Sequence, residues 1–167
     1  MAQPRYVLAL GADFAGVELK NALRDRLQDD ARIELVDYGV PDTSAQTDYP
    51  EIGIQVAEAV ARGAARRAIL VCGTGIGMAI TANKVPGIRA TVAHDPYSAE
   101  RSILSNDCQI LTLGGRVIGV ELAYQLVRSW IGYEFDPASA SARKVGAISA
   151  YEEHAAAAHT AKSGQDV

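Results

Sequence analysis

Short apolar runs rich in β-branched residues alternate along the chain with segments whose apolar residues recur every three or four positions. This alternation is typical of βαβ units, in which helices join parallel strands and cover both faces of the sheet. The predicted strands are residues 6–10, 33–37, 68–72, 89–93 and 109–113. The predicted helices are residues 17–27, 52–60, 96–104, 117–131 and 142–153. We therefore expect a doubly wound, Rossmann-like α/β fold, with a five-stranded parallel sheet in a three-layer α/β/α arrangement.

The 167 residues suit one domain, which we place at residues 1–153. Residues 137–153 follow the last predicted strand and have no strand of their own to cover. We expect this C-terminal segment to pack on the partner subunit of a homo-oligomer. Residues 154–167, which include the alanine run 155–158, are predicted to be a disordered tail.

Composition excludes several classes of partner. The formal charge is −4 and no Lys/Arg-rich run is present, which argues against nucleic acid. No apolar run approaches the ~20 residues that span a bilayer, so no membrane association is expected. The first predicted strand begins within a few residues of Met1, which leaves no room for a signal peptide and predicts a cytoplasmic location.

The two cysteines lie in separate apolar segments, without CxxC or Cys/His spacing. Neither a disulfide framework nor a zinc site is therefore predicted. Cys108, between Asp107 and Gln109, has the environment of a buried structural thiol. Cys72 differs, because it ends an apolar strand and is followed by alternating glycines, Gly73, Gly75 and Gly77.

This loop is the strongest chemical signal in the chain. Free N–H groups at the start of a helix stabilise negative charge and favour a thiolate. A base beside such amides suits removal of a proton next to a carbonyl, where charge moves onto oxygen, and Thr74 would add a hydroxyl donor. The glycines could instead serve only a tight turn. The GxGxxG fingerprint of dinucleotide binding fails, because Met78 occupies its last glycine position.

Other predicted strands also end next to reactive side chains, at the edge where open parallel sheets bind ligands. They are Asp13, His94 and Arg116. Structural alternatives are a helix N-cap for Asp13, a strand-end contact for His94, a surface ion pair for Arg116 and a solvated side chain for Lys144.

Several motifs together resemble the type B ribose-5-phosphate isomerase family, which includes galactose-6-phosphate isomerase subunits. The resemblance covers residues 5 to about 152. The motifs are Cys72-Gly73-Thr74-Gly75-Ile76-Gly77, Ala82-Asn83-Lys84, Gly87-Ile88-Arg89-Ala90, Tyr97-Ser98-Ala99, Ser105-Asn106-Asp107 and Gly115-Arg116-Val117-Ile118-Gly119, with Asp13 and Thr47-Asp48-Tyr49-Pro50 before them.

The resemblance implies an aldose–ketose isomerase that needs neither a metal nor another cofactor, an intramolecular oxidoreductase acting on a small phosphorylated sugar through a cis-enediolate. It implies a homodimer or tetramer with active sites between subunits. Cys72 would be the base, while Thr74 and the amides of Gly73, Gly75 and Gly77 would stabilise the enediolate. Sugar hydroxyls would be bound by Asp13, Tyr49 and Asn106, and the phosphate by Arg116 and by Lys144, which stands where an arginine is usual.

Three departures from the family pattern affect the substrate. Phe14 and Ser105 stand where the family has histidines, the second of which opens the sugar ring, and Ala140 stands at a phosphate-binding arginine. An aldotetrose 4-phosphate cannot close a five-membered ring, so it needs no ring opener. Erythrose 4-phosphate/erythrulose 4-phosphate is therefore a candidate pair beside ribose 5-phosphate/ribulose 5-phosphate, and His94 is a candidate substitute acid. A non-catalytic sugar-phosphate or nucleotide sensor is the alternative function.

Overall fold

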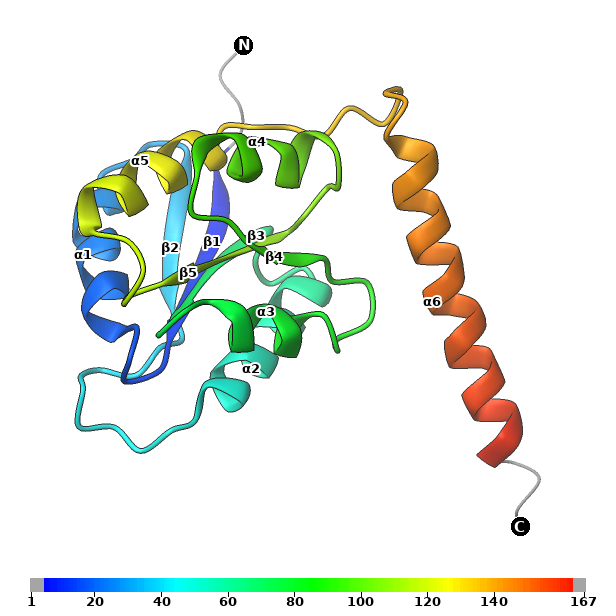
Figure 1. Cartoon of the computed structure of the whole chain (residues 1–167), viewed down its shortest axis with the longest axis horizontal. Coiled ribbons are helices and arrows are strands. Elements are labelled where there is room, and N and C mark those ends of the chain that lie inside the picture. The colour runs from blue at the N-terminus through cyan, green and yellow to red at the C-terminus, as the bar shows by residue number, and fades with distance from the viewer. Residues whose placement is uncertain (1–4, 164–167) are drawn as a thin grey trace.

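The computed structural model describes residues 5–163, which form five strands and six helices. The strands are β1 (Tyr6–Ala12), β2 (Ile33–Asp37), β3 (Arg67–Cys72), β4 (Ala90–Val92) and β5 (Ile110–Gly114). The helices are α1 (Val17–Leu27), α2 (Tyr49–Ala61), α3 (Ile76–Ala82), α4 (Pro96–Leu104), α5 (Val120–Trp130) and α6 (Ala142–Ser163). All strand pairs are parallel in the order β2-β1-β3-β5-β4, which confirms the predicted α/β sheet (Figure 1).

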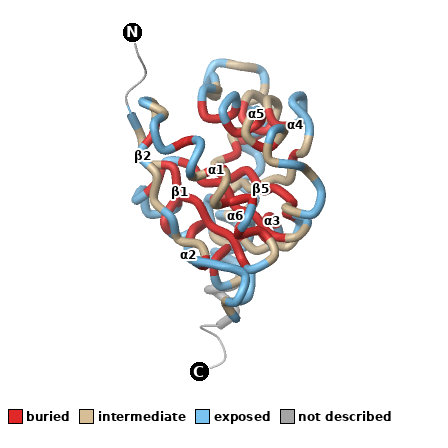
Figure 2. The backbone as a smooth tube through the Cα atoms, turned by 90° about the vertical axis from the view of Figure 1, so that its left-hand side faces the viewer, coloured by how far each residue is buried: buried red, intermediate tan, exposed pale blue. Residues whose placement is uncertain are grey.

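Two apolar clusters fill the space on either side of the sheet. Helices α1, α4 and α5 cover one face and α2 and α3 the other. Along β1, Leu8 and Leu10 belong to the first cluster and Ala9 to the second, as the two-residue period of a strand requires. Buried residues therefore concentrate along the strands at the centre of the molecule (Figure 2).

The register places the carboxyl ends of three strands side by side. Strand β3 lies between β1 and β5, with Ala12 opposite Val71 and Cys72 opposite Gly114. The loops that follow β1, β3 and β5 therefore start next to one another, at the edge where open parallel sheets bind ligands.

Two helix predictions need correction. The helix expected at 117–131 begins at Val120, because the N–H groups of Val117 and Ile118 both donate to the Gly114 carbonyl and form a turn. The tail expected at 154–167 is helical as far as Ser163, because alanine has the highest helix propensity and continues α6. Residues 164–167 of that predicted tail lie outside the described residues.

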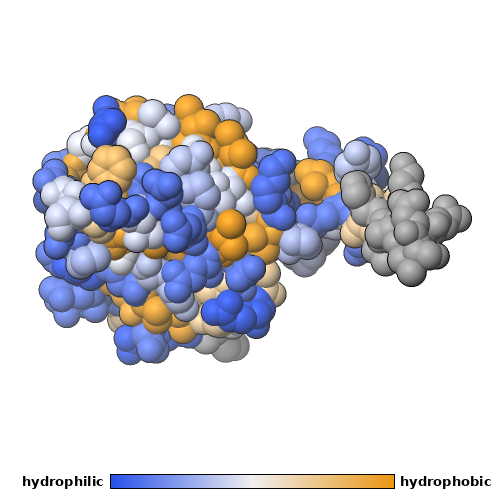
Figure 3. Space-filling view, turned by 90° about the horizontal axis from the view of Figure 1, so that it is seen from below, coloured by the Kyte–Doolittle hydropathy of each residue, from blue (hydrophilic) through white to orange (hydrophobic). Residues whose placement is uncertain are grey.

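Helix α6 projects to one side of the sheet domain (Figure 1). It is joined to the turn between α3 and β4 by a hydrogen bond from the Gly87 N–H to Glu152 Oε2, at 2.8 Å. The side of the domain that faces α6 carries apolar side chains (Figure 3). Ile76 and Ile80 of α3, and Ile148 and Tyr151 of α6, are exposed in the single chain. No helix within residues 5–163 is long and apolar enough to cross a membrane.

Candidate active site

Cys72 lies at the junction of β3 and the glycine-rich loop, where it is buried. Its Sγ accepts a hydrogen bond from the backbone N–H of Gly75 at 3.1 Å. Gly75 has a φ of +82°, a left-handed conformation that costs glycine little and other residues roughly 1–2 kcal/mol. This turn directs the amide back toward the sulfur, so the predicted combination of thiol and amide is present.

Thr112 stabilises this turn through a hydrogen bond to Gly75. It was not predicted as a site residue. It is fully buried in β5, and its hydroxyl donates to the Gly75 carbonyl at 2.9 Å, with the Thr91 carbonyl at 3.3 Å. The signal in the sequence was a single polar residue inside the otherwise apolar run 110–113. Thr112 therefore links β4, β5 and the Cys72 loop.

Thr74 is exposed at the mouth of the same loop. Its Oγ1 accepts a hydrogen bond from the Ile76 N–H at 3.3 Å, in the first turn of α3. Because a hydroxyl donates and accepts at the same time, its proton remains available for a ligand oxygen. The geometry is compatible with the donor role predicted for Thr74.

Two larger side chains border the loop. The Tyr49 ring packs on Gly77, where an added Cβ would lie only 2.7 Å from a ring carbon. Arg116 crosses Gly73, and an added Cβ there would lie 3.6 Å from Arg116 Cδ. The Arg116 N–H also donates to the Gly73 carbonyl at 3.0 Å. Arg116 belongs to none of the ion pairs found within residues 5–163, so its charge is available to an anion.

Asp13 follows β1 at the same edge and is 5% exposed. Its Oδ1 accepts hydrogen bonds from the N–H groups of Ala15 at 3.0 Å and Gly16 at 3.1 Å. The carboxylate therefore fixes a turn before α1, whose N-cap is Gly16 and not Asp13. Burial raises the pKa of Asp13, and the two amides and the charge of Arg116 oppose that rise.

His94 connects the ends of β4 and β5. Its Nε2 accepts the Gly114 N–H at 2.8 Å, so this nitrogen carries a lone pair and not a proton. Burial lowers the pKa of His94, and the neighbouring Asp95 opposes the shift. These contacts favour the structural interpretation of His94 over the substitute acid, because Nε2 is already used as an acceptor.

Replacing His94 with glutamine is expected to reduce the loss of folding stability that accompanies a fall in pH below about 6.5. The folded protein disfavours the protonated ring, so the wild type loses stability as the pH falls from about 6.5 through the lower pKa of the folded state. Glutamine can accept the Gly114 N–H without titrating, at a cost below about 1.5 kcal/mol at pH 8. Melting temperatures between pH 8 and 5 test this, and equal acid-induced losses in both proteins would contradict it.

Asn106 and Lys144 do not join this cluster. Asn106 follows α4, whose C-terminal end leads to the amino end of β5, and its Nδ2 donates to the Arg101 carbonyl at 3.2 Å. Lys144 lies in the first turn of α6. Because Cys72 is at the carboxyl edge of the sheet, one chain does not bring these two predicted binding residues to its own Cys72.

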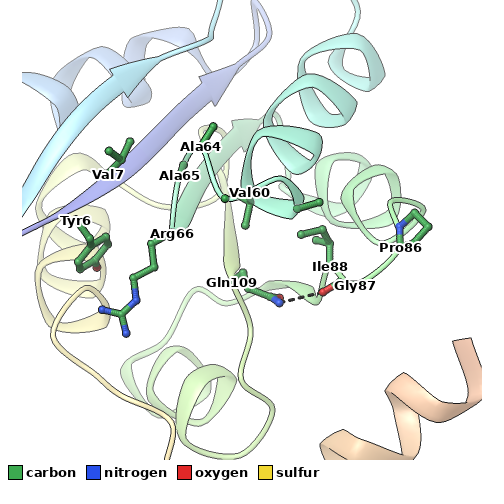
Figure 4. Close-up of a pocket in the computed structure, with 12 residues that line it drawn as sticks. Tyr6, Val7, Val60, Ala64, Ala65, Arg66, Pro86, Gly87, Ile88 and Gln109 are labelled. Carbon is green, nitrogen blue, oxygen red and sulfur yellow. Dashed lines mark hydrogen bonds between the residues drawn. The ribbon is translucent and has the colours of Figure 1, made fainter. Parts of the chain in front are cut away.

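A separate cavity of about 540 Å³ opens at the amino ends of the strands (Figure 4). Tyr6, Val7 and Arg66 line one side, and Gln109 donates to the Gly87 carbonyl at 3.0 Å across the other. None of the predicted site residues lines it. Residues 5–163 also contain no group of three or more His, Cys, Asp and Glu side chains placed to hold a metal ion.

Comparison with known proteins places this geometry in context. The family model described as Ribose/Galactose Isomerase matches residues 8–148. D-erythrulose-4-phosphate isomerase 2 of Mycolicibacterium smegmatis is 55% identical over 87% of this chain and 96% of its own. Ribose-5-phosphate isomerase B of Escherichia coli is 42% identical over 87% of this chain and 96% of its own.

A solved structure agrees with the fold. Ribose-5-phosphate isomerase B of Clostridium thermocellum superimposes with a TM-score of 0.83 and 41% sequence identity, covering 89% of this chain and 98% of that one. The similarity therefore extends over the whole sheet domain and the start of α6.

Proposed function

The chain belongs to the ribose/galactose isomerase family, and we propose that it interconverts a small aldose phosphate and its ketose through a cis-enediolate. The observation that carries the proposal is the Cys72 sulfur, held by the Gly75 N–H where the loops after β1, β3 and β5 meet. Thiol and amides are then placed for proton transfer beside a developing oxyanion.

In the proposed reaction the Cys72 thiolate removes the proton from C2 of the aldose. The electron pair of the C–H bond forms the C1–C2 double bond, and the carbonyl electrons move to O1. Amides of the glycine loop and the Thr74 hydroxyl stabilise that charge. The thiol then returns the proton to C1, the proton of the C2 hydroxyl is transferred to O1, and the carbonyl forms at C2. No net oxidation or reduction occurs, and the predicted independence from cofactors and metals follows from this scheme.

We propose a tetrose 4-phosphate as the preferred substrate. Phe14 cannot donate a proton, and Ser105 Oγ accepts two hydrogen bonds from Arg101. The two positions where the family has histidines therefore supply no free acid, and Nε2 of the candidate acid His94 is already used as an acceptor. A relative that is 55% identical is named D-erythrulose-4-phosphate isomerase 2, which supports the same substrate here.

Assays of both substrate pairs test the proposal. We expect kcat/KM for erythrose 4-phosphate to exceed that for ribose 5-phosphate by at least ~10²-fold, because general acid catalysis of ring opening is worth about 10²–10⁴. Rates are compared by ketose formation under initial-velocity conditions. A higher kcat/KM on ribose 5-phosphate would reject the tetrose preference and leave the isomerase assignment intact.

The active site is proposed to lie between two copies of the chain. Asn106 and Lys144 lie away from the Cys72 of their own chain, so a second copy would bring them to it. The exposed apolar residues of α3 and α6 are surfaces that such an assembly would cover. The dimer or tetramer, the packing of residues 137–153 on a partner and the cytoplasmic location remain predictions.

A further inference from the structure

A cavity of about 550 Å³ lies between β4, the C-terminal end of α4 and α6. Its lining includes Asn83, Arg89, Ser98, Arg101, Asn106 and Ile148. Two arginines line it and no aspartate or glutamate does, although the chain as a whole has a charge of −4. A cavity lined by one sign of charge attracts ligands of the opposite sign, so this one suits an anion.

Arg89 is committed to the turn that follows α4. Its guanidinium donates to the Asn106 and Asp107 carbonyls at 3.0 Å and forms an ion pair with Asp107 Oδ2 at 2.7 Å. Asp107 has a φ of +48°, which is unusual for a residue other than glycine. Arg89 therefore braces the Asn106–Asp107 turn, and its charge is already compensated.

Arg101 is held in place but keeps free donors. Its Nε and one Nη donate to Ser105 Oγ at 2.9 and 2.5 Å, and the Asn106 side chain donates to its backbone carbonyl. The other nitrogen, Nη1, lies 3.6 Å from Glu100 Oε1 in a solvated ion pair, which is weak. A guanidinium has five N–H groups, so more than two remain for a ligand.

Lys144, in the first turn of α6, is not itself part of the cavity lining. It precedes Ile148, which lines the cavity, by four residues, and residues four apart lie on one face of a helix. One chain therefore brings Arg101 and Asn106 together in one cavity, with Lys144 one helical turn before its α6 wall. A guanidinium and an amide are groups that bind a phosphate monoester with neighbouring hydroxyls.

We propose that Arg101, positioned by Ser105, binds the phosphate group of the sugar phosphate that is processed at the Cys72 of a second copy. The inference rests on the proposed function, because it needs this half-site to meet the Cys72 half-site across an interface. Arginine suits the role because its planar fork of N–H groups matches phosphate oxygens bidentately. Ser105 turns Arg101 toward the ligand, where a free side chain would lose more conformational entropy on binding.

The test compares Arg101→Met and Arg101→Lys with the wild-type chain. We expect Arg101→Met to raise both KM for erythrose 4-phosphate and the inhibition constant of inorganic phosphate by ~10–100-fold, with kcat changed less than about threefold. Arg101→Lys keeps the positive charge but lacks the planar, bidentate guanidinium, so it should recover part of the lost phosphate affinity. Ser105→Ala should raise KM by a smaller factor. Arg62→Met, an exposed arginine at the end of α2, is the matched control and should change nothing.

Calorimetric titration with inorganic phosphate separates this inference from the proposed function, because it needs no turnover. Phosphate binding that weakens in Arg101→Met but not in Arg62→Met supports the site, even if neither sugar phosphate is isomerised. Unchanged KM and unchanged phosphate affinity in a folded Arg101→Met overturn the inference, and so does a fall confined to kcat. Loss of phosphate binding in both variants also overturns it.

Discussion

Replacing Cys72 with alanine is expected to lower kcat by about 10²–10⁴-fold, because the variant lacks the proposed base for proton transfer between C1 and C2. KM should change little, since the amides, Arg116 and the proposed partner residues still bind the substrate. The measurement is kcat for erythrose 4-phosphate, together with incorporation of solvent deuterium at the carbon next to the carbonyl. The wild type should exchange this hydrogen and Cys72→Ala should not. A sugar-phosphate sensor would exchange nothing even as the wild type.

The matched control is Cys108→Ala. Burial raises the pKa of the Cys108 thiol to about 11, so this sulfur is uncharged at neutral pH and has no role as a base. We expect its kcat to stay within about twofold of the wild type, although truncation of a buried side chain lowers stability. Circular dichroism confirms folding of both variants. If Cys72→Ala keeps more than a tenth of wild-type kcat, Cys72 is not the base.

The fold was predictable because burial on both faces imposes a simple rule on each central strand. Residues 68–72 are uniformly apolar, and in the structure every residue of β3 is buried between the two helical layers. The edge strand β4 shows the limit of the same rule. Its three residues are only partly buried, so the apolar pattern overestimates its length as 89–93.

The alanine run after residue 154 is predicted to be a disordered tail because it lies at the end of the chain, where order is usually lost. The structure shows helix to Ser163, so local helix propensity, and not burial, determines the conformation of this segment. The sequence pattern therefore predicted the first part of α6, residues 142–153, and missed its continuation through the alanine run.

The geometry of the candidate site was predictable where its residues share one loop and less so where distant segments meet. Cys72 and the glycines are adjacent in sequence, so their combination was visible. Thr112 is 37 residues from Gly75 and contacts it only because β3 and β5 are neighbours. The role of His94 likewise depends on the hydrogen-bond partner of its Nε2. That partner, the Gly114 N–H, is 20 residues away in the sequence and is seen only in the structure.

Replacing Gly75 with alanine is expected to reduce stability and activity together. The φ of +82° costs an L-residue roughly 1–2 kcal/mol, and the added Cβ would lie 3.0 Å from the carbonyl carbon of Leu113 and 3.1 Å from its nitrogen. Since β5 backbone cannot move aside easily, the loop must shift and carry the Gly75 amide away from the sulfur. Losing one preorganised donor costs ~10²–10³ in kcat, which is the expected fall.

Gly63→Ala is the control that separates strain from chemistry. Gly63 has a φ of +77°, almost the same conformation, but an added Cβ meets nothing within 4 Å, and the residue lies after α2 at the edge opposite Cys72. It should lose the same 1–2 kcal/mol or so in chemical denaturation and keep wild-type kcat. If Gly75→Ala is folded at the assay temperature and its kcat equals that of Gly63→Ala, then the amide beside Cys72 does not stabilise the transition state, and the loop's glycines serve only the turn.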